Sequence, residues 1–258
     1  MSESCCGGGR HHGDKAAERH GKRRMRGAVA VLAGLMFVLV GVALSLRGER
    51  LTLDDVAARL AKVGLMCRNI ERDGRGLFRL DLSESDVVDL SALKGLPLSA
   101  LDIHKTAVSD LSALQGMPLV SLIACKSRVA SLPPLKGMPL ETLKCSHTQV
   151  SDLSPLRGMS LRTLWINETK VEDLYPLRGM PLAELQVNGS LVSDLSPLEG
   201  MPLHTLVFSP EQTERGGEII RRMEKLTRVN GMPAERYWEI YDRVGGRGAF
   251  FAPRPERP

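Results

Sequence analysis

Aromatic residues are scarce in this sequence, at 4% of 258 residues, although 43% of the residues are hydrophobic. A folded core must therefore be built from aliphatic side chains. Net positive charge is also scarce beyond the first 26 residues, because these 26 residues hold seven Lys or Arg against three acidic residues and so carry +4 of the net +5. The rest of the chain is close to neutral and offers no broad basic face, which argues against nucleic acid as a partner.

Catalytic and metal-binding patterns are missing as well. No nucleophile is paired with a base, and no glycine-rich phosphate loop follows a strand, so we expect no enzyme, no cofactor and no small-molecule substrate. His104, His147 and His204 fall at different places in the repeated unit described below and build no metal site.

One long apolar run covers residues 27–46, GAVAVLAGLMFVLVGVALSL, with no charge over 20 positions. A helix of this length matches the core of a bilayer, which predicts a transmembrane helix. Basic residues crowd its N-terminal edge, which places residues 1–26 in the cytoplasm and the rest of the chain in the periplasm or outside the cell. A cleaved signal peptide is the alternative, with Ala43 and Ser45 as its small-residue cleavage site.

The two ends of the chain have compositions typical of disorder. Residues 1–26 are basic and Gly-rich, and we expect a disordered tail that lies against anionic lipid headgroups. Cys5, Cys6, His11 and His12 offer ligands for a soft metal, but their spacing matches no closed zinc pattern. Residues 245–258 are rich in Pro, Gly and Arg and are also predicted to be disordered.

Residues 75–200 contain six copies of one 21-residue unit without an insertion. Numbered from the residue before its proline, a copy such as 138–158, MPLETLKCSHTQVSDLSPLRG, has leucine at positions 3, 6, 16 and 19, valine at 13 and glycine at 21. Alternation over positions 4–8 predicts a short strand that pairs in parallel with its neighbours. Such a strict period predicts a stacked solenoid, because each unit needs its neighbours to cover its apolar face.

The second half of each copy predicts a tight turn. Leucines three residues apart in DLSPL suit a 3₁₀-like turn that returns along the other face of the solenoid. Proline within the turn removes an N–H group that would have no partner there. An aspartate precedes the turn and can accept its free N–H groups, as at Asp110, Asp152, Asp173 and Asp194.

Non-repeated segments flank the repeats on both sides, and solenoid ends need such covers. For the N-terminal cap, residues 51–74, we expect a helix that starts after Thr52 and stops at Gly64, then a hairpin turn at Asp73-Gly74. One face of this helix carries Val56, Leu60 and Val63.

For the C-terminal cap, residues 209–244, we expect two helices separated by a turn at Asn230-Gly231. The second helix starts from Pro233. The first helix is indicated by apolar residues at helical spacing, Ile219, Ile220, Met223 and Leu226.

The L-x-x-L-x-L core and the T-x-V-x-D-L-S-P-L segment resemble the leucine-rich repeat family, in particular the short repeats of bacterial internalin-type proteins. The linking GMPL phrase is similar to repeat regions behind a membrane span in some bacterial Ser/Thr kinases, although these 258 residues contain no kinase domain. The resemblance covers residues 75–208 and implies an α/β solenoid with a parallel sheet, an irregular or 3₁₀ convex side and helical caps. The chain departs from the family at position 11, where the family usually has asparagine and this chain has a serine or threonine: Ser85, Thr106, Ser127, Thr148, Thr169 and Ser190. A hydroxyl supplies fewer hydrogen-bond donors than the amide of asparagine.

The resemblance also implies that the sheet carries the functional surface, toward which positions 5 and 7 of each strand point. Most residues there are small and polar, and Trp165 is the one large aromatic. Exposed aromatics with polar neighbours are typical anchors of protein interfaces. We therefore nominate a protein-binding site composed of Trp165, Lys144, Thr163, Asn167, Gln186 and Ile123. The alternative is that Trp165 folds over neighbouring side chains and marks no site.

Together these patterns predict a non-catalytic, membrane-anchored leucine-rich-repeat scaffold that binds a protein outside the cytoplasm. The alternative is a single-span sensor or accessory protein that signals through dimerisation of its span and through its basic tail. Ala30 and Gly34 offer a small-xxx-small face for such dimerisation.

Overall fold

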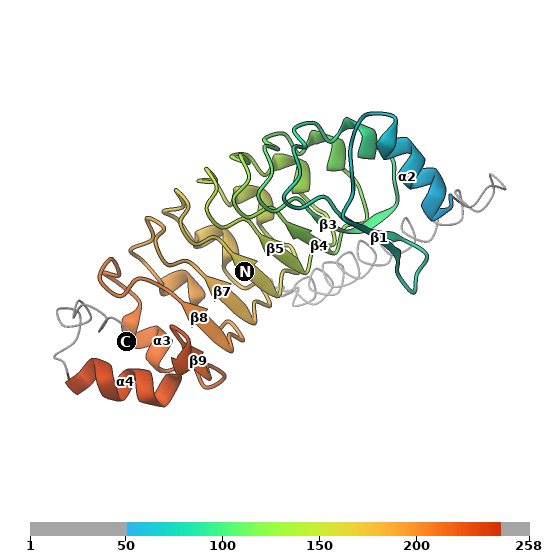
Figure 1. Ribbon diagram of the computed structural model, residues 1–258. Coiled ribbons are helices and arrows are strands. Elements are labelled where there is room, and N and C mark those ends of the chain that lie inside the picture. The colour runs from blue at the N-terminus through green and yellow to red at the C-terminus, as the bar shows by residue number, and fades with distance from the viewer. Residues whose placement is uncertain (1–50, 244–258) are drawn as a thin grey trace, which may run out of the picture. The chain divides into compact units, whose positions relative to one another are not determined.

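A computed structural model of the chain describes residues 51–243. Within them the elements follow one another in a single row, from α2 at one end to α4 at the other (Figure 1). The predicted transmembrane helix, both predicted tails and the cysteines and histidines of the first tail lie outside the described residues. No helix of the described part is long and apolar enough to cross a membrane.

The solenoid is built on a ten-stranded sheet whose strands lie in sequence order. Strands β2 to β7 come one from each of the six copies, and β8 comes from a partial copy that begins at Met201. These strands pair in parallel through identical positions, so that Leu143 lies opposite Leu122 and Leu164. This confirms the predicted parallel solenoid, and the bounds are β2 Phe78–Asp81, β3 Leu98–Asp102, β4 Ser121–Ile123, β5 Thr142–Lys144, β6 Thr163–Trp165, β7 Glu184–Gln186 and β8 Thr205–Val207.

Opposite the sheet, each full copy makes the predicted 3₁₀ turn over positions 17–19. Asp152 shows how the turn is held, since its carboxylate accepts hydrogen bonds from the backbone N–H of Ser154 at 2.7 Å and from the Ser154 hydroxyl at 2.7 Å. Glycine at position 21 then reverses the chain with φ between 73° and 79°. The six turns are η1 Ser91–Leu93, η2 Ser112–Leu114, η3 Pro133–Leu135, η4 Ser154–Leu156, η5 Tyr175–Leu177 and η6 Ser196–Leu198.

The core is an aliphatic column that runs the length of the repeats. In the copy from Met138, Leu140, Leu143, Cys145 and Val150 are all fully buried. Positions 6, 8 and 13 are buried in every copy and position 3 in every copy after the first, so each layer of leucines covers the layer before it. Because no copy is shorter or longer than 21 residues, the layers stay in register throughout.

The hydroxyls at position 11 are part of this interior. Each one donates a hydrogen bond to the backbone carbonyl three residues earlier, as Thr148 does to Cys145 at 2.6 Å. Five of the six are buried, at Thr106, Ser127, Thr148, Thr169 and Ser190, and Ser85 is half-buried. A short hydroxyl therefore replaces the amide of the family pattern by bonding locally within its own turn.

The N-terminal end of the sheet is closed by α2 (Leu53–Ala61) and by β1 (Asn69–Arg72), which pairs antiparallel with β2. Thr52 caps α2 as predicted, and its side chain accepts from the Asp55 N–H at 3.1 Å. Val56 and Leu60 are fully buried. Val63 lies beyond the helix and is 56% exposed, so it does not share the predicted buried face.

The C-terminal end differs from the two helices that the spacing predicts. The first helix, α3 (Gly217–Arg221), ends after five residues, and the chain then forms β9 (Arg228–Val229) and β10 (Met232–Pro233) around the Asn230-Gly231 turn. Strand β9 pairs with β8, so it satisfies backbone groups that a continued helix would leave open at the sheet edge. The second helix, α4 (Ala234–Arg243), follows and buries Tyr237.

Candidate functional site

The outward side of the sheet presents two columns of side chains, positions 5 and 7, which we call the sheet face. Position 6 between them is leucine in every strand from β2 to β8 and is at most 3% exposed. The sheet face therefore carries the residues that alternate away from the core: Arg79, Asp81, Ala100, Asp102, Ser121, Ile123, Thr142, Lys144, Thr163, Trp165, Glu184, Gln186, Thr205 and Val207.

Trp165 lies half-buried in the middle of the sheet face and is held by the strands on either side. The ammonium of Lys144 lies 3.5 Å from the centroid of the indole ring, in a cation–π contact. The indole N–H donates to the Glu184 carboxylate at 2.9 Å, and the amide of Gln186 donates to the same oxygen at 3.1 Å. These four residues form one cluster, which we call the Trp165 cluster, and it is pre-organised by its own contacts.

The structure brings only part of the nominated site together. Lys144, Trp165 and Gln186 belong to the Trp165 cluster, and Thr163 lies one strand away from Glu184 in direct register. Asn167 lies beyond the end of β6, where its side-chain oxygen accepts from the Ser146 hydroxyl. Its role is thus to join neighbouring copies.

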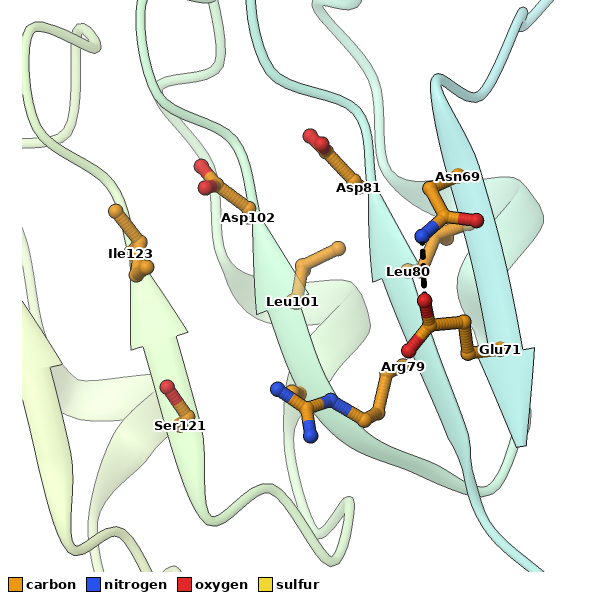
Figure 2. Close-up of a pocket in the computed structure, with 10 residues that line it drawn as sticks. Asn69, Glu71, Arg79, Leu80, Asp81, Leu101, Asp102, Ser121 and Ile123 are labelled. Atoms are coloured by element: carbon orange, nitrogen blue, oxygen red, sulfur yellow. Dashed lines mark hydrogen bonds between the residues drawn. The ribbon is translucent and has the colours of Figure 1, made fainter. Parts of the chain in front are cut away.

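Ile123 lies on β4 directly opposite Lys144, and so at the edge of the Trp165 cluster. It lines a shallow depression at the N-terminal end of the sheet face, in the region of β1 to β4 (Figure 2). Whether the nominated residues bind a protein stays a prediction.

Sequence reasoning did not nominate two parts of the sheet face. The pattern within one copy does not link Glu184 to Trp165, because Glu184 lies at position 5 of one copy and Trp165 at position 7 of the copy before it. Only the stacking of the copies brings the two side chains together. Asp81 and Asp102 occupy position 7 of β2 and β3, the first two strands of the repeats, and lie directly opposite each other. Two like charges next to each other in one outward column were a signal that could have marked this end of the sheet.

The acidic residues at the N-terminal end of the sheet face differ in whether they have an ion-pair partner. Glu84 bridges Lys105 at 2.8 Å and Arg68 at 2.5 Å, and these contacts lower the pKa of its carboxyl to about 2. Burial raises the pKa of Asp102, and the charge of Asp81 adds to that rise. Unlike Glu84, neither Asp81 nor Asp102 forms a salt bridge within residues 51–243.

No grouping of three or more His, Cys, Asp or Glu side chains in residues 51–243 could hold a metal ion. Cys145, at inward position 8, is fully buried, and burial raises the pKa of its thiol. It is a core residue, as its position predicts. The sheet face offers a ligand polar and charged side chains together with a few apolar ones, such as Trp165 and Ile123.

Seven parallel strands in register, a 21-residue period, a leucine core and a 3₁₀ turn in each copy define a leucine-rich-repeat solenoid. Among solved structures, internalin C2 of Listeria monocytogenes is similar at 27% identity and a TM-score of 0.46 over 50% of this chain and 69% of that one. The internalin inlF of the same species is similar at 22% identity and a TM-score of 0.49, and the match covers 58% of this chain and 53% of the inlF chain.

No protein-family model and no curated protein matches the chain. Both internalin structures match at TM-scores below 0.5. The class therefore follows from the geometry of the repeats themselves.

Proposed function

We propose that this chain is a non-catalytic scaffold that is anchored in a membrane through residues 27–46 and binds a protein through the sheet face outside the cytoplasm. The observation that carries the proposal is the sheet face itself, a continuous outward surface on rigid strands that no other element of residues 51–243 covers. The repeated leucines and valine of each copy are committed to the core, and the glycine at position 21 and, in most copies, the aspartate before the 3₁₀ turn are committed to the turns. The outward columns differ from copy to copy and are free to specify a ligand.

The Trp165 cluster supports a protein as that ligand. A half-buried indole fixed by Lys144 and Glu184 offers a large contact area without having to be ordered on binding. Such rigid aromatic groups with polar neighbours are enriched among the residues that dominate interface energies.

Proximity labelling from the full chain in its native membrane tests this proposal. We expect wild type to label a protein that Trp165→Ala loses, because truncating an anchor residue of an interface costs about 2 kcal/mol or more, equivalent to at least about thirtyfold in affinity. Tyr175→Ala is the matched control, since Tyr175 is an aromatic side chain, 54% exposed, on the 3₁₀ turn opposite the sheet. The same labelled proteins for wild type and Trp165→Ala would argue against binding at the sheet face.

The membrane anchor needs a test of its own. We expect the mature chain to retain residues 1–26 and to stay with the membrane after alkaline carbonate extraction, because a 20-residue uncharged helix remains inserted. Mass spectrometry of the purified chain distinguishes this from the alternative. A mature chain that begins near Ser45 would show a cleaved signal peptide and refute the anchor.

A further inference from the structure

The depression at the N-terminal end of the sheet face has a volume of about 280 Å³. It is open to the surface and combines charged and aliphatic side chains from neighbouring strands (Figure 2). Asp81 and Asp102 lie at its upper edge, Ile123 lies beside Asp102, and Glu71 closes the opposite side. A side chain from another molecule therefore meets two carboxylates next to an apolar wall.

The two carboxylates are fixed in place by the backbone. One oxygen of Asp81 accepts the N–H of Ser83 at 2.8 Å, and one oxygen of Asp102 accepts the N–H of His104 at 2.8 Å. The two residues are register partners on adjacent parallel strands, which places them roughly 4.8 Å apart along the sheet. Each carboxylate keeps a second oxygen for another donor.

Neither carboxylate has a salt-bridge partner among the described residues. Arg68 is bound to Glu84, and the guanidinium of Arg79 points toward Ser121 and away from both aspartates (Figure 2). In the Trp165 cluster, by contrast, Lys144 and Glu184 both interact with the indole. The lining of the depression thus holds three acidic side chains, Glu71, Asp81 and Asp102, against the single positive charge of Arg79.

We infer that the depression is the docking point for an arginine presented by a loop of the protein partner. This rests on the proposed function, and it adds a chemical class of contact to it. The planar guanidinium has donors on two edges, so it can bridge the free oxygens of Asp81 and Asp102 on neighbouring strands. Ile123 and Ala100 provide apolar surface for the methylene stem of that arginine. A lysine, which is a point charge, satisfies the pair less well.

A cyclic peptide library displayed on phage and panned against the full chain tests the inference. Peptides that bind at this end of the sheet are expected to contain arginine and to bind Asp81→Asn/Asp102→Asn at least about tenfold more weakly than wild type. The carbonyl oxygen of asparagine still accepts the backbone N–H, so the fold is kept. Replacing the arginine of a selected peptide by lysine should also weaken binding.

The matched control is Glu172→Gln/Glu199→Gln, which makes the same change of net charge at two exposed residues outside the sheet face. Its peptide affinities should stay within about twofold of wild type, because distant exposed charges are screened by salt. Equal losses in both double variants, or equal binding after arginine is replaced by lysine, would show a general charge attraction and overturn the inference.

Peptides weakened by Trp165→Ala but unaffected by Asp81→Asn/Asp102→Asn would also overturn the inference, while leaving the proposed function in place. The proposed function fails separately, if proximity labelling does not change in Trp165→Ala.

Discussion

The buried hydroxyl of Thr148 gives the sharpest test of how the repeats are held together. Its side chain is 2% exposed, and its Oγ1 donates to the carbonyl oxygen of Cys145 at 2.6 Å. Valine has nearly the same shape but no hydroxyl, so Thr148→Val removes this one hydrogen bond and little else. The same bond recurs at position 11 of every copy, so the result bears on the whole solenoid.

The expected cost follows from what the change leaves behind. In Thr148→Val the Cys145 carbonyl loses its hydroxyl donor in a site that is closed to water, which should lower the free energy of unfolding by about 1–3 kcal/mol. Thr148→Ser is the matched variant, because it keeps the hydroxyl and removes one methyl group, at a cost of about 0.8 kcal/mol. The valine variant should therefore be the less stable of the two.

Urea unfolding of the full chain, followed by circular dichroism, measures both differences. The denaturant dependence of the unfolding free energy should be unchanged, since neither variant alters the surface exposed on unfolding. A valine variant as stable as wild type, or a serine variant at least as destabilised as the valine one, would refute a structural role for the hydroxyl bonds.

Three further predictions concern single residues and use the same unfolding assay. Asp152→Ala should lower the free energy of unfolding by about 0.5–1 kcal/mol, at the low end for a charged acceptor because the carboxylate is exposed. The Ser154 backbone hydrogen bond lowers the pKa of Asp152 in the folded state. The difference in stability should therefore be present at neutral pH and be lost as the pH falls from the ordinary pKa of about 3.9 through the lowered one. His147 has φ of 56°, so His147→Val should cost about 1–2 kcal/mol while His147→Gly costs nothing, and equal stabilities would contradict this. Asp102→Asn should raise the free energy of unfolding at neutral pH by about 0.2–1 kcal/mol, because it removes a like charge opposite Asp81. Since the pKa of Asp102 is raised in the folded state, this gain should disappear in acid, where the wild-type carboxyl becomes protonated. A loss of stability at neutral pH would contradict this prediction.

The repeats could be predicted from the sequence because their interactions are local or recur at a fixed interval. Leucine at position 6 has the same neighbours in every copy, so one period determines the pairing of β2 to β8. The turn that starts after Asp152 depends on residues within a few positions of it. Such contacts can be inferred without knowing the rest of the fold.

The C-terminal cap could not be predicted in the same way. The apolar spacing after Gly217 fits a helix, but the open edge of β8 offers unpaired backbone groups, and Val229 pairs opposite Leu206 instead. The contact between Trp165 and Glu184 likewise joins different positions of successive copies, so no pattern within one copy shows it. Where tertiary pairing competes with local spacing, the spacing alone gave a helix that was too long.

Because every copy has the same length, residues at the same position of different copies lie at fixed separations along the sheet face. Asp102 and Trp165 lie at position 7 of β3 and β6, three strands apart, which corresponds to roughly 14 Å at the usual strand spacing. Removing or duplicating one 21-residue copy between them would change that separation in a single step of about 4.8 Å without turning any side chain to the other face. A partner that contacts both ends must match this spacing, so copy number itself becomes a determinant of specificity.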